Sequence, residues 1–158
     1  MSGASGGATL LAAPEDLPLE VAWVFYAHMN GGNYAMGCVP LTRMQTIRDF
    51  WCAFSHVNID AMLDGRVTIH GHAVRGVSLF REPCRPEWED EHNKSGGSFI
   101  CRHVLSAYDT ETWRDLCMAA VGETLPCNGI RLMCKTACDA VTTKFEIWTR
   151  HYDQTVPA

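Results

Sequence analysis

The sequence predicts one α+β domain on three grounds: its length and apolar content, its strand-like alternation, and two stretches of helical periodicity. The chain has 158 residues, 47% apolar and 20% charged, which is enough to bury a core in a single domain. Strands are expected near 21–27, 77–81, 99–105, 130–135 and 143–150, and helices near 46–57 and 109–121. Residues 1–16, rich in Gly, Ser and Ala, are expected to form a disordered tail before a domain at 17–158.

Charge and cysteine content exclude several classes of protein. A net charge of −5 argues against indiscriminate nucleic-acid binding, because such proteins hold phosphates with a broad basic surface. The eight cysteines include no Cys-x-x-Cys pair and no zinc-finger spacing, so reduced thiols are expected. The sequence shows no signal peptide and no membrane-length apolar run, which predicts a cytoplasmic protein, or also a nuclear one, without a membrane partner.

The first helix is predicted from its start signal. Thr46 and Asp49 stand at the distance of a capping box, and apolar residues follow at helical spacing as far as Val57. The resulting apolar stripe is wide for a single buried face. Trp51 on this stripe is therefore either a core residue or an exposed anchor for a partner.

The loop at 83–99 is the segment whose composition is least typical of a purely structural role. Prolines precede Trp88, acidic residues follow it, and Gly96 and Gly97 close the loop before the next strand. A tryptophan beside Glu89 suits guanine, because the indole offers a stacking face and the carboxylate accepts from the N1–H and N2–H₂ donors. The alternative is a surface acidic turn that contains a core tryptophan.

The last predicted strand carries an unusual face. Period-two geometry places Lys144, Glu146, Trp148 and Arg150 on the same side. A solvated sheet face seldom needs a tryptophan, whereas a site for a base and phosphates does. This face is therefore a second candidate part of a nucleotide site.

An enzyme is the competing hypothesis, and its main support is the pair His70 and His72. Alternation on an extended segment would place both imidazoles on one face as metal ligands, but the spacing offers no third ligand. No Gly-x-Ser-x-Gly motif and no phosphate-cradling glycine loop occurs. Surface histidines are the better interpretation, so no catalytic residue, metal or cofactor is predicted.

These motifs together resemble the cap-binding translation initiation factor 4E family. Its members carry Pro-x-Trp-Glu-Asp-Glu followed by Asn-Lys-x-Gly-Gly and an aromatic residue, as this chain does from Pro86 to Phe99. The likeness covers roughly residues 17 to 150 and includes Leu17-Pro18-Leu19 with Trp23, Asp49-Phe50-Trp51, 113–123 and Ile147-Trp148-Thr149. Family members continue beyond the end of this chain, so it is identified as a C-terminally short form, either by nature or because a segment is not included.

The resemblance implies a particular α+β architecture. The family fold is a single curved antiparallel sheet, with its concave face toward the ligand and helices packed on its convex face. The family's C-terminal helix and last strands are then absent from this chain. Strand order and curvature follow from the resemblance alone.

The resemblance also implies a function, which is to bind the 7-methylguanosine 5′ cap of mRNA. Tyr34 and Trp88 would sandwich the methylated base, Glu89 would read its N1/N2 edge, and Trp148 would lie beside the methyl group. The position of Tyr34 follows from counting back from Asp49-Phe50-Trp51 without gaps. A tyrosine there offers a smaller stacking surface than the family's tryptophan.

Lysines and one arginine are implied as the phosphate contacts. Lys144 would meet the cap phosphates, and Lys135 matches a family arginine that does so. The loop after Lys135 is about four residues longer than in the family, so Arg131 on the same strand face is the substitute candidate.

A second implied surface binds protein. On the convex face, a scaffold protein of the initiation factor 4G type, or a 4E-interacting inhibitory protein, would dock a short helix across Pro18, Ile47, Trp51, Met118 and Gly122. The alternative is a degenerate family member that keeps this surface and acts as an interaction module or translational repressor without strong cap binding.

Overall fold

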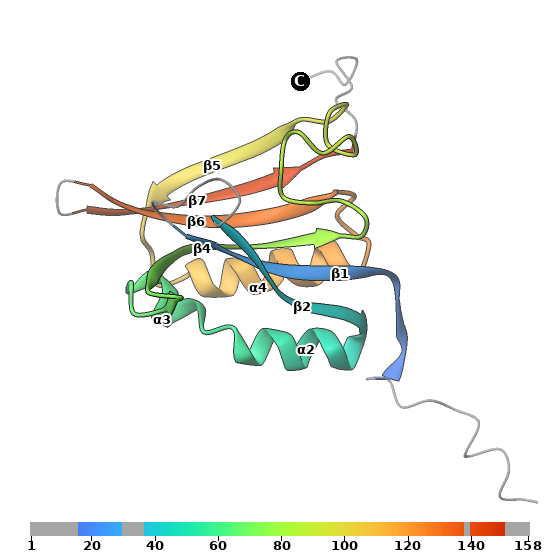
Figure 1. Cartoon of the computed structure of the whole chain (residues 1–158), viewed down its shortest axis with the longest axis horizontal. Coiled ribbons are helices and arrows are strands. Elements are labelled where there is room, and N and C mark those ends of the chain that lie inside the picture. Colours follow the sequence, from blue (N-terminus) through green and yellow to red (C-terminus); the bar gives the residue numbers. More distant parts are fainter. Residues whose placement is uncertain (1–15, 30–36, 138–139, 151–158) are drawn as a thin grey trace, which may run out of the picture.

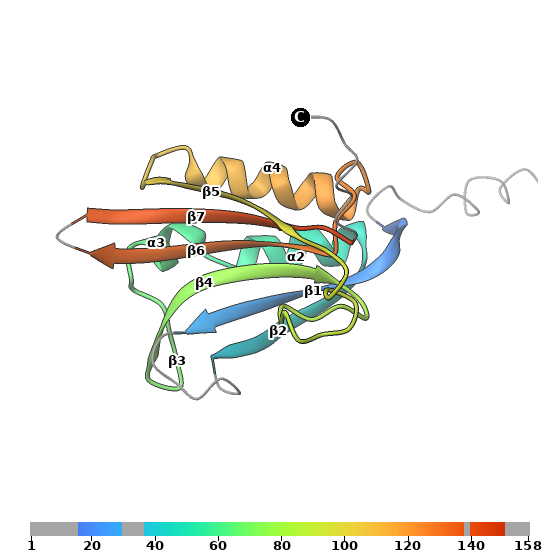
Figure 2. The ribbon, with the colours of Figure 1, turned by 90° about the horizontal axis from the view of Figure 1, so that it is seen from above.

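The computed structural model describes residues 16–29, 37–137 and 140–150. Within these ranges the chain forms a seven-stranded antiparallel sheet with three helices. All three helices lie on one side of the curved sheet, its convex face (Figure 1 and Figure 2). The predicted α+β class with a single curved sheet is therefore confirmed.

The sheet brings together strands that are distant in the sequence. Its order is β2, β1, β4, β6, β7, β5, and β3 pairs with β4. The bounds are β1 Pro18–Met29, β2 Cys38–Thr46, β3 Thr68–Ile69, β4 His72–Arg81, β5 Ser98–Val104, β6 Gly129–Ala137 and β7 Ala140–Trp148. The last two strands pair further along the chain than their alternation predicts, because the antiparallel ladder continues as far as Ala137 and Ala140.

The helices are α2 Ile47–His56, α3 Ile59–Leu63 and α4 Asp109–Val121. The predicted capping box of α2 is present: Thr46 Oγ1 accepts from the Asp49 amide at 3.0 Å, and Asp49 Oδ2 accepts from the Thr46 amide at 3.1 Å. The sequence did not predict α3. Its N-cap is Asn58, whose side-chain oxygen accepts from the Ala61 amide at 2.9 Å.

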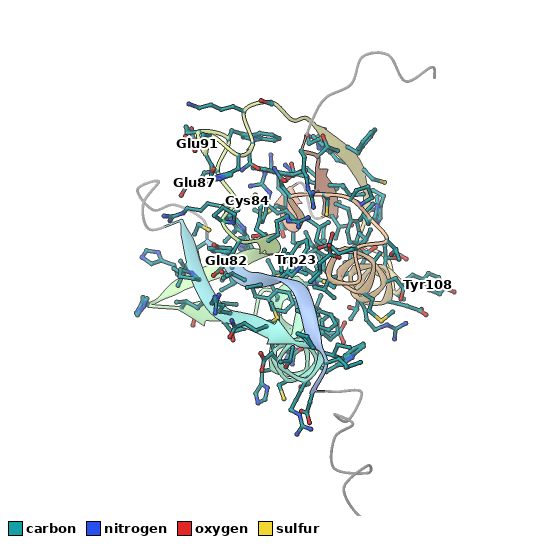
Figure 3. The ribbon with its side chains drawn as sticks, turned by 90° about the vertical axis from the view of Figure 1, so that its right-hand side faces the viewer. Trp23, Glu82, Cys84, Glu87, Glu91 and Tyr108 are labelled. Atoms are coloured by element: carbon teal, nitrogen blue, oxygen red, sulfur yellow. The ribbon has the colours of Figure 1, made fainter. Side chains whose placement is uncertain are left out.

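The main core lies between the sheet and the helices. Figure 3 shows Trp23 in this interior, with Tyr108 at the surface beside α4. The core side chains include Trp23, Phe25, Leu79, Leu132 and Phe145 from the sheet, and Phe50, Trp113, Cys117 and Ala120 from the helices. A smaller apolar cluster of Tyr26, Phe80, Cys84 and Trp148 lies apart from this core. Phe145 and Trp148 thus face opposite sides of β7, as period two predicts.

The remaining sequence expectations concern histidines, thiols and membrane contact. His70 and His72 are both exposed, and the described ranges contain no group of three potential metal-ligating side chains. The seven cysteines that the structure describes are free. Over the same ranges, no helix has the length and apolarity needed to cross a membrane.

Candidate ligand and partner sites

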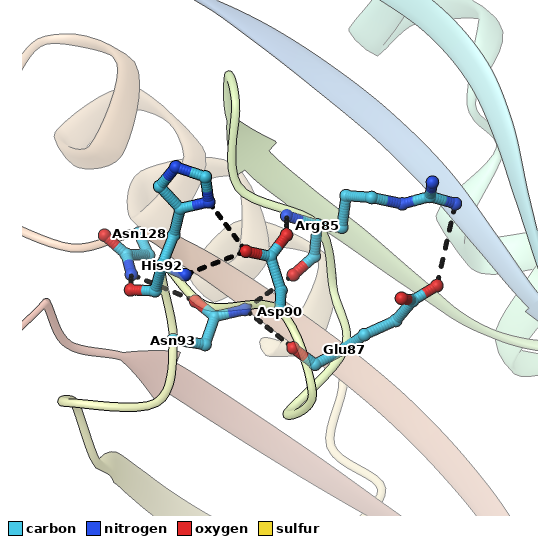
Figure 4. A network of polar contacts seen from close by, with 6 residues as sticks. All are labelled: Arg85, Glu87, Asp90, His92, Asn93 and Asn128. Carbon is cyan, nitrogen blue, oxygen red and sulfur yellow. Dashed lines mark hydrogen bonds and ion pairs between the residues drawn. The ribbon is translucent and has the colours of Figure 1, made fainter.

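The loop between β4 and β5 is held from inside by Asp90 (Figure 4). Asp90 accepts from the backbone amides of Arg85 and His92, both at 2.9 Å, and its Oδ1 lies 2.7 Å from the His92 ring Nδ1. Burial raises the pKa of Asp90, but the hydrogen bonds from His92 and Arg85 outweigh it, so the pKa is lowered. The carboxylate therefore stays ionised and fastens both ends of the turn.

Two asparagines complete this support. The Asn93 side-chain amide donates to the carbonyls of Arg85 and Glu87 at 2.7 and 2.8 Å. The Asn128 side-chain amide donates to the His92 carbonyl at 2.8 Å and to Asn93 Oδ1 at 2.9 Å, which ties the loop to the start of β6 (Figure 4). Both asparagines are buried. The acidic loop is thus a built structure with defined backbone contacts.

Trp88 and Glu89 occupy the turn between these fastened positions. Glu89 is exposed, and no hydrogen bond or ion pair within the described chain involves its carboxylate. Both of its oxygens are therefore free to accept from a ligand. Among the loop's acids, Asp90 supports the fold while Glu89 remains available.

Trp88 is stacked on Trp148. The two ring centroids are 3.7 Å apart with an interplanar angle of 11°. The Phe80 and Trp148 rings are perpendicular, with centroids 5.1 Å apart. Trp148 is only 1% exposed, whereas Trp88 is 42% exposed. A planar ligand can stack on the outer side of Trp88 as it stands, but it reaches Trp148 only if Trp88 turns away.

A buried acid lies beside this aromatic pair. Glu146 is 3% exposed and pairs with Arg131 on one oxygen and with Lys144, at 3.0 Å, on the other. The indole Nε1 of Trp148 also donates to it at 3.4 Å. Burial alone would raise the pKa of Glu146, but the hydrogen bonds and charges of Arg131 and Lys144 lower it. Two of the three predicted phosphate ligands therefore already hold an anion of the protein itself.

All three predicted phosphate residues line one cavity. Its volume is about 700 Å³. Lys144 of β7 lies between Arg102 of β5 and Met133 of β6 on the concave face. Thr142 of β7 pairs with Lys135 of β6 on the same face. Sequence reasoning missed two basic residues of this cavity, Arg75 and Arg102. The alternation of residues in β5 could have placed Arg102 on the concave face. No sequence pattern indicated Arg75, because only the pairing of β4 with its neighbours brings it to this cavity.

The five predicted protein-binding residues come together on the other face. Pro18, Ile47, Trp51, Met118 and Gly122 line one groove of about 340 Å³, formed by the start of β1, α2 and the end of α4. Trp51 is 42% exposed, so it is a surface residue and not part of the core. Its ring centroid lies 5.0 Å from that of Phe50 and 6.0 Å from that of Phe54, both in edge-to-face geometry, and these contacts fix its position. Tyr34, the remaining predicted residue, lies outside the described residues.

Fold and sites together define a class of protein: a curved-sheet α+β binding protein with an aromatic and charged site on the concave face and an apolar groove on the convex face. The profile of the family described as Eukaryotic initiation factor 4E matches residues 18–157. This chain therefore belongs to the eukaryotic initiation factor 4E family.

Relatives and solved structures agree with this assignment. Eukaryotic translation initiation factor 4E of Saccharomyces cerevisiae is 31% identical over 122 residues, which are 73% of this chain and 51% of the yeast protein. Eukaryotic translation initiation factor NCBP of Triticum aestivum is 30% identical over 123 residues, 75% of this chain and 47% of the wheat protein. The chain thus spans about half the length of these curated relatives.

Two solved structures share the fold. Ascaris suum eIF4E-3, solved in complex with the m7G cap, superposes with a TM-score of 0.71 at 21% identity, covering 88% of this chain and 76% of that one. Caenorhabditis elegans eIF4E-3, solved with the 4E-binding protein Mextli and a cap analog, superposes with a TM-score of 0.63 at 21% identity, covering 85% and 75%.

Proposed function

We propose that this chain binds the 7-methylguanosine 5′ cap of mRNA at the concave site. One observation carries the proposal: an exposed Trp88 stands next to an unpaired Glu89 in a loop that Asp90 and the two asparagines hold in place. The stacking face and the carboxylate match the two recognition features of guanine. N7-methylation makes the base cationic, which adds a cation–π attraction of about 0.5–2 kcal/mol to the stack.

The proposed binding includes a rearrangement of Trp88. Insertion of the base next to Trp148 breaks the stack between the two indoles, which is worth about 0.5–1.5 kcal/mol beyond the buried area. Two new base–aromatic stacks at about 1–3 kcal/mol each would offset this term. Tyr34 is the proposed second stacking residue. Lys135, Lys144 and Arg131 are the proposed phosphate contacts.

We further propose that the convex groove around Trp51 takes a short helix of a scaffold protein of the initiation factor 4G type, or of a 4E-interacting inhibitory protein. The neighbouring solved structure with Mextli supports a protein partner for this family. Both proposed activities are binding activities, which fits membership of an initiation factor family better than the enzyme hypothesis. We propose that the protein acts in the cytoplasm, where translation starts.

A degenerate family member that binds protein without strong cap binding is the second candidate. Glu146 favours it, because this acid already neutralises Lys144 and Arg131. The two candidates differ in one measurable property, the selective affinity for a methylated guanine nucleotide.

Retention on 7-methyl-GTP resin separates the candidates. Under cap binding, the protein stays on the resin, elutes with free 7-methyl-GTP and does not elute with GTP. If it flows through while still capturing a scaffold-type helix, the degenerate function is correct and the cap proposal is wrong.

A further inference from the structure

The concave cavity holds more positive charge than the proposed cap phosphates require. Arg75, Arg102, Arg131, Lys135 and Lys144 all line it, so five of the chain's 13 lysine and arginine residues meet at one place although the net charge is −5. Clustered like charges repel one another, and an anionic ligand relieves that repulsion. The cavity is therefore a candidate site for a longer chain of phosphates.

Glu146 divides these five cations into two groups. Arg131 and Lys144 pair with it, whereas none of the ion pairs between described residues involves Arg75, Arg102 or Lys135. Arg75, Arg102 and Lys135 thus keep their charge uncompensated within the described residues. A phosphate that binds these three does not have to compete with a buried carboxylate.

Arg102 is placed at a cost to stability. It lies directly opposite Lys144 in the β5–β7 ladder. Two like charges directly opposite each other on neighbouring strands destabilise a sheet. Arg102 is exposed and bound to no acid in the described ranges, so its own charge is not compensated, whereas Glu146 compensates that of Lys144.

Arg75 is placed by an irregularity in β4. His28 of β1 pairs with Gly76 and Met29 pairs with Val74, so Arg75 is the extra residue of a β-bulge. Bulges re-aim side chains and occur often beside binding sites. The Nε atom of Arg75 is buried and has no hydrogen-bond partner among the described residues. An unsatisfied buried donor is costly unless a bound acceptor satisfies it.

The length of the charged strip indicates its ligand. From Trp148 to Thr142, β7 runs six residues, which is about 20 Å at the rise of a strand. One strand of a stacked duplex rises about 3.4 Å per phosphate along its axis, and an extended single strand rises more, so the strip is long enough for a few successive phosphates. It starts at the proposed base site beside Trp148 and ends in the cavity that Arg75, Arg102 and Lys135 line.

We infer that Arg75 and Arg102 hold the phosphodiester groups of the nucleotides that follow the cap. This inference rests on the proposed cap binding and extends it from a single nucleotide to the beginning of the RNA. Phosphates carry no base identity, so this part of the binding is independent of RNA sequence. Salt weakens it, because each phosphate contact releases counterions.

The test measures affinity against ligand length. Fluorescence titration compares 7-methyl-GTP with capped RNAs of one, three and five nucleotides, for the wild type and for Arg75→Gln/Arg102→Gln. The wild type is expected to bind the five-nucleotide RNA about tenfold more tightly than 7-methyl-GTP, with a steeper salt dependence. In the double variant this gain disappears, the salt slope falls by about 1.4, and 7-methyl-GTP binding stays within twofold.

A matched control removes the same charge elsewhere. Arg48→Gln/Arg114→Gln neutralises one arginine of α2, which pairs with Asp16, and one of α4, which pairs with Glu111. This variant is expected to keep the length-dependent gain. Arg102→Gln alone is expected to leave the melting temperature unchanged or to raise it by up to about 3 °C, since it removes the repulsion with Lys144. A clear fall in melting temperature would instead assign Arg102 a structural role and overturn its part in the inference.

The remaining outcomes separate this inference from the proposed function. If the double variant keeps the length-dependent gain, the inference is wrong. If the variant already loses affinity for 7-methyl-GTP, the arginines hold the phosphates of the cap itself, and the assignment to the following nucleotides is overturned. If the wild type binds capped and uncapped RNA equally well and the double variant binds both more weakly, the cap proposal fails while the assignment of Arg75 and Arg102 to RNA phosphates stands.

Discussion

Glu146 sets the electrostatics of the concave site. It satisfies Arg131, Lys144 and the indole of Trp148 together, so these three groups form one buried network. Removing one partner from such a network is costly, because it leaves a buried charge uncompensated. A phosphate that binds Lys144 therefore has to share it with Glu146, and the affinity of the site depends on that competition.

Glu89 offers the sharpest test at the scale of one residue. Glu89→Gln removes the charge that we propose reads the guanine edge, and it is expected to weaken 7-methyl-GTP binding about 10- to 100-fold, the equivalent of about 1.5–3 kcal/mol. Because Glu89 makes no contact that supports the fold, thermal unfolding should be unchanged. Glu91→Gln, an exposed acid of the same loop, is the matched control. Equal affinity of Glu89→Gln and wild type would refute the base-reading role.

His28 predicts a pH dependence of stability. It is buried with its Nε2 2.7 Å from Ser78 Oγ, and its pKa is lowered from 6.5 to about 4 by burial and by Arg131, against a smaller opposite effect of Glu146. Between these two pKa values the unfolded state binds a proton that the folded state does not. The stability contribution is thus complete above pH 6.5 and is lost as pH falls toward 4.

Denaturant unfolding at pH 7.5 and pH 4.5 measures this effect. The loss of unfolding free energy between the two conditions should be about 2–3 kcal/mol smaller in His28→Gln than in wild type, since each pKa unit is worth about 1.4 kcal/mol. Gln keeps a hydrogen-bonding side chain near Ser78 without the titration. Identical pH profiles for the two proteins would show that His28 is not held neutral.

At the scale of elements, the β6–β7 hairpin presents two lysines in different surroundings. Lys135 is exposed opposite Thr142, whereas Lys144 is part of the Glu146 network. Neutral variants of either are expected to weaken 7-methyl-GTP binding about three- to tenfold and to leave 7-methylguanosine binding nearly unchanged, because the nucleoside has no phosphate.

Thermal unfolding distinguishes the two lysines. Lys144→Gln leaves Glu146 with less compensation, so its melting temperature should fall by about 2–6 °C. Lys135→Gln should melt like wild type. A larger triphosphate-specific effect of Arg131→Ala than of either lysine variant would show that Arg131 takes the place of Lys135.

At the scale of the whole molecule, the sheet separates two surfaces. The Trp88–Trp148 stack and the basic cavity lie on one face, and the groove around Trp51 lies on the other. A core of buried side chains lies between the sheet and the helices and keeps the two surfaces apart. Changes in one surface should therefore leave the other intact.

Trp51→Ala tests this separation. An exposed tryptophan in an apolar groove can supply about 2 kcal/mol or more of interface energy, so the variant should lose capture of a scaffold-type helix. Binding of 7-methyl-GTP should stay within about threefold. The melting temperature is the control, since a fall of more than about 8 °C would show that Trp51 serves core packing, as its contacts with Phe50 and Phe54 permit.

The sequence by itself determined the local features of this protein. Thr46 and Asp49 specify the start of α2 because the capping box is formed by residues three apart. Period two placed Trp148 and Phe145 on opposite faces of β7 because side chains alternate in any strand. The loop motif around Trp88 and Glu89 was recognisable because it is a continuous run of residues.

The tertiary structure alone decided how distant residues meet. Trp88 and Trp148 stack because the β4–β5 loop reaches over the end of β7, and no local pattern encodes that contact. Arg75 joins Lys144 and Arg102 because a bulge in β4 and the pairing of β5 with β7 bring three separate strands to one cavity. Glu146 neutralises Arg131 because neighbouring strands place them side by side, and burial then makes this ion pair persist. These contacts depend on the register of the sheet, which is set by the packing of the whole chain.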